Sequence, residues 1–217
     1  MAEDGGAHGD GLFLVFEGVE ASGKSTQARR LADRLEAAGV EHRLVREPGG
    51  TEAGERIREV VLDPDLALDP RTELLLMLAA RAEFVRRSVR PALKAGEVVL
   101  ADRYELSTFA YQGLARGLGL ERVRRLNRFA TGGLRPDATL VLMVDPEEAR
   151  ARRSDASPDR MEGEGADFHA AVDRAYRRLA RQEEGAVAVN ASGSPDEVEV
   201  RIRTAVAERW PDLLSAG

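Results

Sequence analysis

Residues 18–26 combine the residue types and the spacing that phosphate binding requires. They read Gly-Val-Glu-Ala-Ser-Gly-Lys-Ser-Thr, which fits the phosphate-loop pattern G-x-x-x-x-G-K-[ST]. Gly18 and Gly23 lack a Cβ atom, so the backbone can turn tightly and direct its N–H groups at phosphate oxygens. Lys24 supplies a cation for the β- and γ-phosphates, and Ser25 supplies a hydroxyl ligand for Mg²⁺. The predicted triphosphate-binding residues are Gly18, Val19, Glu20, Ala21, Ser22, Gly23, Lys24, Ser25 and Thr26.

The segments on either side of this loop support the interpretation. Residues 12–16 are an apolar run of strand length, and residues 26–38 have apolar side chains at helical spacing, so the loop joins a strand to a helix. Lys24 and Lys94 are the only lysines among 32 basic residues. A chain that otherwise uses arginine thus has the compact ammonium group at this position. The alternative, a Gly-rich surface turn with an exposed lysine, explains none of this context.

A second phosphate-site signal is the carboxylate that ends the apolar run 97–102. Parallel strands bring their carboxyl ends to one edge of a sheet, so Asp102 is expected beside the phosphate loop, where it can hold Mg²⁺ directly or through water. Many buried strands end in Asp, so the signal depends on its pairing with residues 18–26.

Apolar runs alternate with amphipathic segments along the chain. Strands are expected at 12–16, 40–45, 97–102, 138–144 and 186–189, and helices at 26–38, 53–62, 72–93, 106–116, 120–130, 147–153, 168–180 and from about 195 to 210. This alternation predicts an α/β fold, a five-stranded parallel sheet with helices on both faces, as in phosphate-loop NTPases. We expect one domain over 12–217.

Composition limits the other possibilities. With 43% hydrophobic and 32% charged residues, the 217-residue chain resembles a soluble globular protein, and it has no apolar run long enough to span a membrane. The net charge of −6 argues against sequence-independent nucleic-acid binding. The absence of cysteine is compatible with a cytoplasmic location. Residues 1–11 are Gly-rich and acidic and are expected to form a disordered tail rather than a targeting signal.

Arginines cluster in the segment 150–160, at Arg150, Arg152, Arg153 and Arg160. If the segment about 150–165 closes as a lid, these guanidinium groups can lie against a phosphoryl group in transfer and exclude water. The alternative on charge alone is an ordinary solvated helix face.

Five segments make the chain resemble the bacterial thymidylate kinase family, which transfers the γ-phosphate of ATP to dTMP. The resemblance runs from Leu12 to about Val206. The segments are the phosphate loop with Phe16 and Glu17 before it; Arg-Glu-Pro-Gly-Gly-Thr at 46–51; Ala-Ala-Arg-Ala at 79–82; Asp-Arg-Tyr at 102–104 with Ser107, Thr108 and the Tyr-Gln-Gly of 111–113; and Asp-Arg-Met-Glu at 159–162. It implies a single kinase domain that uses ATP and dTMP with Mg²⁺ in the cytoplasm.

The resemblance also implies roles for individual residues. Glu20 would lie near the acceptor sugar and the metal waters, Arg58 and Arg103 would hold the acceptor phosphate, and Arg81 would hydrogen-bond a thymine carbonyl. The implied catalytic residues are Lys24, Arg103, Arg152, Arg160 and Glu20; the implied metal ligands are Ser25 and Asp102; and the implied dTMP-binding residues are Glu47, Pro48, Arg58, Met77, Arg81, Arg103, Thr108, Tyr111 and Gln112. The family forms homodimers through long helices, and the helix at 72–93 has enough apolar surface for that or for the core.

Met77 departs from the family pattern. Family members usually stack thymine on Phe or Tyr four residues before the base-reading arginine, and methionine packs on a ring with less geometric precision. Selectivity for thymine over uracil is the property that this change affects.

The chain offers no evident catalytic base, because His8, His42 and His169 all fit structural positions. Phosphoryl transfer to a monophosphate needs none, since the attacking phosphate oxygen has a second pKa near ~6 and is ionised at pH 7. Two alternatives stay open: a kinase of another nucleoside monophosphate, and a phosphate-loop NTPase switch that binds a partner.

Overall fold

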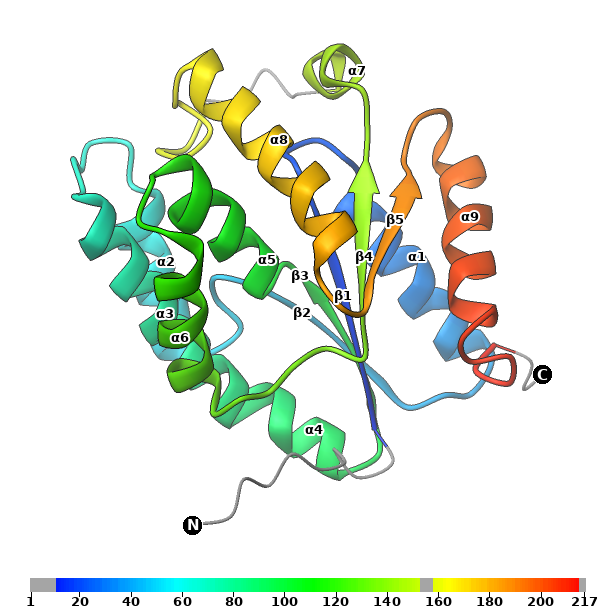
Figure 1. Ribbon diagram of the computed structural model, residues 1–217. Coiled ribbons are helices and arrows are strands. Elements are labelled where there is room, and N and C mark those ends of the chain that lie inside the picture. The colour runs from blue at the N-terminus through cyan, green and yellow to red at the C-terminus, as the bar shows by residue number, and fades with distance from the viewer. Residues whose placement is uncertain (1–10, 153–157, 215–217) are drawn as a thin grey trace.

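The computed structural model describes residues 11–152 and 158–214. Five parallel strands form one sheet in the order β2-β3-β1-β4-β5, which confirms the predicted fold class (Figure 1). The strands are β1 (Leu12–Gly18), β2 (His42–Arg46), β3 (Val98–Asp102), β4 (Ala138–Met143) and β5 (Ala186–Asn190). The predicted tail and His8 lie outside the described residues, except Gly11, which packs so closely that a Cβ would lie 2.6 Å from the Leu93 carbonyl oxygen.

Helices cover both faces of the sheet because the side chains of its buried strands alternate between two apolar clusters. In β1, Leu14 and Phe16 pack with α1 and α9, whereas Phe13 and Val15 pack with the segment 84–93 on the other face. The helices are α1 (Lys24–Ala37), α2 (Glu52–Leu62), α3 (Pro70–Phe84), α4 (Arg90–Lys94), α5 (Glu105–Thr108), α6 (Leu120–Thr131), α7 (Pro146–Ala151), α8 (Ala166–Gln182) and α9 (Pro195–Ala207), with π-helical turns η1 (Val85–Val89) and η2 (Phe109–Ala115).

Two predicted helices are interrupted by π-helical turns. The helix expected over 72–93 is α3, η1 and α4 in succession, and the turn ends just before Pro91, which has no N–H to donate. The helix expected over 106–116 is α5 followed by η2. On α3, Leu74 and Leu78 form the buried stripe, and Leu75 is 59% exposed.

The strand order brings the functional loops together. The chain passes from β1 over β3 to β2 and then returns through β3 and over β1 to β4, so the crossovers diverge at β1 and β3. Ligands of such sheets bind beyond the carboxyl ends of the strands at this point. The phosphate loop follows β1 there, and Asp102 ends β3 directly beside it, paired in register with Phe16. In Figure 1 this edge is at the top, near α7 and the start of α8. Across the described residues, no helix is both long and apolar enough to cross a membrane.

Candidate active site

The phosphate loop has the backbone conformation that its glycines predict. Gly18 has a φ of 139°, and a Cβ there would lie 2.6 Å from the carbonyl oxygen of Leu142 on the neighbouring strand. Gly23 has a φ of 91° and caps α1, which begins at Lys24. The Lys24 ammonium is buried and donates to the Val19 carbonyl oxygen at 2.6 Å, so it curls back into the loop. The N-terminus of α1 therefore faces the loop, as an anion site requires.

The Lys24 ammonium has an unusual titration. Burial, together with the nearby positive charge of Arg103, lowers its pKa from 10.5 to about 7, although Asp102, Glu17 and Glu20 act in the opposite direction. An anion that binds beside Lys24 stabilises the charged form of this buried ammonium group. The site is thus prepared to bind phosphate through a group whose charge depends on pH near neutrality.

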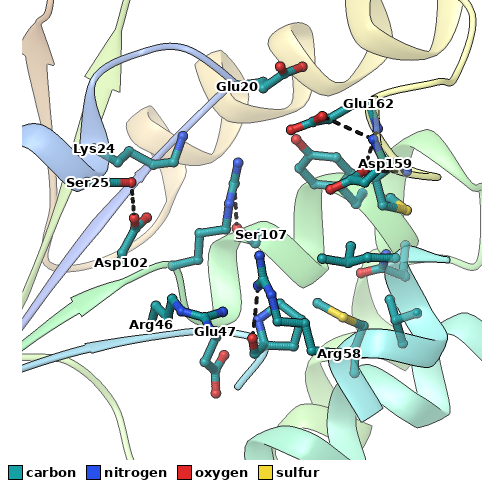
Figure 2. A pocket seen from close by; sticks show the side chains of 18 of the residues that line it. Glu20, Lys24, Ser25, Arg46, Glu47, Arg58, Asp102, Ser107, Asp159 and Glu162 are labelled. Atoms are coloured by element: carbon teal, nitrogen blue, oxygen red, sulfur yellow. Dashed lines mark hydrogen bonds between the residues drawn. The ribbon is translucent and has the colours of Figure 1, made fainter. Parts of the chain in front are cut away.

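Ser25 and Asp102 form the part of the site that suits a magnesium ion. The Ser25 hydroxyl donates a hydrogen bond to the Asp102 carboxylate, so two oxygen ligands lie together beside Lys24 (Figure 2). Among the described residues no cluster of three or more metal-binding side chains exists. A hydroxyl and one carboxylate fit Mg²⁺, which takes its remaining ligands from nucleotide phosphates and water.

Two cavities meet at the phosphate loop and share Ala21, Lys24 and Ser25. The first, of about 330 Å³, extends between β1, β3, α2, α3 and the start of α8. The second, of about 450 Å³, lies between the start of α1 and the loop before α9, and includes Arg152. The first cavity is lined by Glu20, Ala21, Lys24, Ser25, Arg46, Glu47, Pro48, Arg58, Val61, Leu62, Met77, Asp102, Arg103, Ser107, Tyr111, Gln112, Asp159, Met161, Glu162 and His169. Figure 2 shows Lys24 and Asp102 facing Asp159 and Glu162 across it.

Arg103 is fixed at the wall of the first cavity by a buried carboxylate network. Its guanidinium donates to the Ser107 hydroxyl at 3.0 Å and to the Tyr176 hydroxyl at 3.2 Å. Glu17, fully buried at the end of β1, accepts hydrogen bonds from both of these hydroxyls at 2.7 and 2.8 Å and from the main-chain N–H of Tyr104 at 2.8 Å. The carboxylate therefore sets the position of the guanidinium through two shared partners.

Two further arginines, from β2 and α2, line the first cavity. Arg58 on α2 donates to the Pro48 carbonyl oxygen at 3.0 Å, and Arg46 at the end of β2 pairs with Glu55 at 2.9 Å. The bond between Glu47 and Pro48 is cis. With Arg103 and Lys24, these residues give one end of the cavity the positive charge that a phosphate monoester needs.

Arg81 lies beneath the first cavity and does not line it. It is 1% exposed, and its guanidinium donates to Glu47 at 2.7 Å, to Asn127 at 2.8 Å and to the Tyr104 carbonyl oxygen at 2.8 Å. The resemblance predicts Arg81 as a base-reading residue, but here its donors serve these buried partners. Glu47 does reach the cavity; burial, partly opposed by Arg81, raises the pKa of Glu47 to about 7.

The arginines predicted for the lid are divided between different sites. Arg152 lines the second cavity. Its guanidinium donates to the carbonyl oxygen of Ala191 at 3.1 Å and to that of Gly193 at 3.0 Å. Arg160 is directed elsewhere, to the Val61 carbonyl oxygen at 2.7 Å and to Glu73 at 2.8 Å, and is absent from both cavity linings. Arg150 is exposed, and Arg153 lies outside the described residues. Of the predicted lid arginines that the structure describes, Arg152 lines the second cavity, whereas Arg150 and Arg160 line neither.

The family model described as thymidylate kinase matches residues 16–202. The chain belongs to the thymidylate kinase family. Similar proteins named thymidylate kinase come from Symbiobacterium thermophilum (46% identity, covering 92% of this chain and 94% of that protein), Deinococcus radiodurans (46%, 92% and 98%) and Pseudomonas fluorescens (46%, 94% and 97%).

Most residues expected from the thymidylate kinase pattern meet at the first cavity. Met77, Tyr111 and Gln112 line it together with Pro48 and Arg58. Thr108 does not: it is fully buried behind the cavity, and its hydroxyl has no hydrogen-bond partner there. Thr108 ends α5 and Tyr111 lies in the π-helical turn η2, so the change of helix type between them separates side chains that ordinary helical spacing would keep on one face.

Several residues of the site were missed by reasoning from the sequence. Glu17, Ser107, Asp159, Glu162 and His169 were given no role, although four of them occur within or beside segments that carry the family resemblance. Asp159 accepts hydrogen bonds from the main-chain N–H groups of Met161 and Glu162, which closes a tight turn at the cavity. His169, expected to be purely structural, lines the same cavity. Local sequence carried no signal for His169, since it comes from α8, the helix after the segment predicted to be a lid.

Proposed function

We propose that this protein transfers the γ-phosphate of ATP to dTMP, giving ADP and dTDP. The observation that carries the proposal is the pair of cavities that share Ala21, Lys24 and Ser25. A switch or motor needs one nucleotide site at its phosphate loop. Two sites that converge on one lysine suit a donor and an acceptor whose reacting phosphates must meet.

The charges support an assignment of the two cavities. The first has Arg46, Arg58 and Arg103 around one end and Met77 with Gln112 at another part of its wall, which suits a phosphate monoester joined to a base. The second has Arg152 and the loop before α9 beside the start of α1, which suits ATP. We therefore assign dTMP to the first cavity and the adenosine part of ATP to the second.

The mechanism follows from what these residues can do. The acceptor phosphate is ionised at neutral pH and attacks without a base. Lys24 and Arg103 stand where charge develops on the transferring group, and Arg152 approaches from the ATP side. Glu20, which lines the first cavity, fits a role near the acceptor sugar. Mg²⁺, held by Ser25 and Asp102, would neutralise charge on the ATP phosphates.

The first test is diphosphate formation from MgATP with dTMP, dUMP, dCMP, dGMP, AMP and UMP in separate reactions. Strong turnover with dTMP and weak turnover with purine monophosphates supports the proposal. Turnover confined to another monophosphate would replace the substrate but keep the kinase. ATP hydrolysis that ignores every monophosphate would indicate the switch instead. Lys24→Ala is the matched control and should lose turnover by several orders of magnitude while it stays folded.

We further propose a cytoplasmic homodimer with one kinase domain over 12–217 and a lid at about 150–165. Exposed apolar side chains on the adjoining helices α3 and α6 support the dimer: Leu75 is 59% and Phe129 is 89% exposed, with Leu126 one turn before Phe129. A second copy of this chain is the partner we expect. Light scattering should report a dimer that Phe129→Glu converts to a monomer; a monomeric wild type would contradict the proposal.

A further inference from the structure

Glu73 on α3 is a fully buried carboxylate beneath the wall of the first cavity. Its Oε1 accepts a hydrogen bond from the Gln112 side-chain nitrogen at 2.7 Å, and its Oε2 accepts from Arg116 at 3.1 Å and from Arg160 at 2.8 Å. Burial alone would raise the pKa of Glu73, but the hydrogen bonds from Gln112, Arg116 and Arg160 outweigh it and lower the pKa. The carboxylate is therefore ionised, and it only accepts hydrogen bonds.

An acceptor in this position determines which way the Gln112 amide points. The side chain of Gln112 is 1% exposed, so water does not compete for it. Because Glu73 can only accept, the NH₂ group of Gln112 must face it, and the amide oxygen must face the other way. That oxygen is buried and has no hydrogen-bond partner among the described residues, and Gln112 lines the first cavity. A buried acceptor without a partner at a cavity wall is a position for a ligand donor.

The position of Gln112 in the cavity wall identifies the part of the ligand that it meets. Glu73 and Met77 are one turn apart on α3, so Gln112 and Met77 belong to the same region of the wall. Arg46 and Arg58 come from different elements, β2 and α2. If Arg46 and Arg58 hold the phosphate of the acceptor, its base lies against Met77 and Gln112.

We propose that Glu73 is a positioning residue that makes the acceptor pocket selective for bases with a ring N–H. It does so by holding the amide oxygen of Gln112 toward the base. Thymine and uracil present an imide N–H at N3, which donates to this oxygen. Cytosine presents a lone pair at N3, which the oxygen repels. The inference rests on the proposed function, because it assumes a pyrimidine monophosphate in the first cavity.

Arg116 and Arg160 have a part in this arrangement. They neutralise Glu73: both contact its Oε2, and Arg116 also donates to Oε1, the oxygen that accepts from Gln112, at 3.3 Å. Arg116 also pairs with Glu164 and lies 4.4 Å from the Phe168 ring centroid. Without these cations a fully buried carboxylate would take up a proton, could then donate, and would no longer fix the amide. The position of Arg160, unexpected for a lid arginine, thereby acquires a role in the acceptor pocket.

The test compares kcat and KM for dTMP and dCMP in the wild type and in Glu73→Gln. The variant keeps the shape of the side chain but offers both a donor and an acceptor, so Gln112 can turn its NH₂ group to the cavity. We expect the dTMP-to-dCMP ratio of kcat/KM to fall by about tenfold or more, mostly through KM. In a Gln112→Ala background, Glu73→Gln should change the ratio no further. Glu83→Gln, on the same helix but paired only with Arg86 and Arg87 outside the cavity, is the control and should leave the ratio unchanged.

The outcomes separate this inference from the proposed function. An unchanged ratio in Glu73→Gln, with normal dTMP turnover in the wild type, overturns the role of Glu73 and leaves the kinase intact. No dTMP turnover in the wild type overturns both. If Glu73→Gln fails to fold, the wild type is tested with N3-methyl-dTMP, which lacks the ring N–H. Rejection of this analogue supports the inference, and turnover equal to that of dTMP overturns it.

Discussion

The guanidinium of Arg103 donates a hydrogen bond to the main-chain carbonyl oxygen of Gly18, 3.2 Å away, and so joins the end of β3 to the first residue of the phosphate loop. Arg103 has a φ of 75°, in the left-handed region that non-glycine residues seldom adopt. Its main-chain N–H is held by the Phe16 carbonyl oxygen at 2.9 Å. This backbone conformation and the shared partners of Glu17 fix a cation beside Lys24, where a phosphoryl group must pass.

Arg103→Lys should lose at least about 10²-fold in kcat, because one ammonium group cannot contact Gly18, Ser107 and a phosphate together. The measurement is steady-state turnover of dTMP with saturating MgATP. Arg43→Lys serves as the control, since Arg43 pairs with Glu97 at the sheet surface. A kcat for Arg103→Lys within threefold of the wild type would remove Arg103 from the reaction.

The sequence predicted the sheet well because its signals were local. Four of the five strands are apolar runs beside a glycine or a charged residue, whereas β2 (His42–Arg46) is mostly polar and was predicted from its place after the helix that stops at Gly39. The strand, loop and helix around Lys24 follow one another within 27 residues. The π-helical turns were not predicted, although Pro91, which cannot donate the hydrogen bond of a helix interior, is a local signal for the first of them.

The lowered pKa of Lys24 predicts that ATP binding takes up a proton. In the free protein the ammonium pKa is about 7, and bound phosphates favour the charged form and raise it. At pH 8 the wild type should therefore take up close to one proton per ATP, and affinity should weaken by up to about tenfold per pH unit above 7. Calorimetry in two buffers of different ionisation enthalpy measures the uptake. Lys24→Met should bind ATP weakly and should take up no proton when it binds. Proton uptake equal to that of the wild type would assign the proton to another group.

The site was predicted unevenly from the sequence. The structure brings Lys24, Ser25 and Asp102 together at one cavity, as predicted, because a short motif and one strand end define their positions. Arg81 and Arg160 were assigned to ligands, but both have buried carboxylate partners, Glu47 and Glu73, that lie 34 and 87 positions away in the chain. Such pairings follow from packing, and residue type alone does not distinguish an arginine held by a carboxylate from one free to bind phosphate.

Glu47→Gln should change how stability depends on pH. In the folded protein burial raises the pKa of Glu47 to about 7, against 4.5 in its ordinary state. The folded state then binds more protons than the unfolded state between pH 4.5 and 7. The ionisation of Glu47 therefore lowers the free energy of unfolding as pH rises through that window. Relative to the wild type, Glu47→Gln should gain up to about 3 kcal/mol between pH 5 and pH 8. Urea unfolding at both values measures this, with Glu52→Gln at an exposed position of α2 as the control. Parallel pH curves for Glu47→Gln and the wild type would show that Glu47 titrates normally.

Met77 predicts how strongly the pocket distinguishes thymine from uracil. Contact with one methyl group contributes about 0.8 kcal/mol, so the wild type should prefer dTMP over dUMP by only about fourfold in kcat/KM. Met77→Phe presents a flat ring that can stack on the base, an interaction worth about 1–3 kcal/mol in other base-binding proteins. The thioether of Met77 already contributes part of this stacking energy in the wild type. The KM for dTMP should therefore fall by up to about tenfold while kcat stays within about twofold, since the ring is remote from the transferred phosphate.

The matched control for this change is Val200→Phe, because Val200 is exposed on α9 and lines neither cavity. Met77→Ala completes the series and should raise the KM for dTMP through lost contact with the base. If Met77→Phe and Met77→Ala both leave the KM unchanged, residue 77 does not touch the base. The assignment of that part of the first cavity to thymine would then be wrong, and Gln112 would need a different partner.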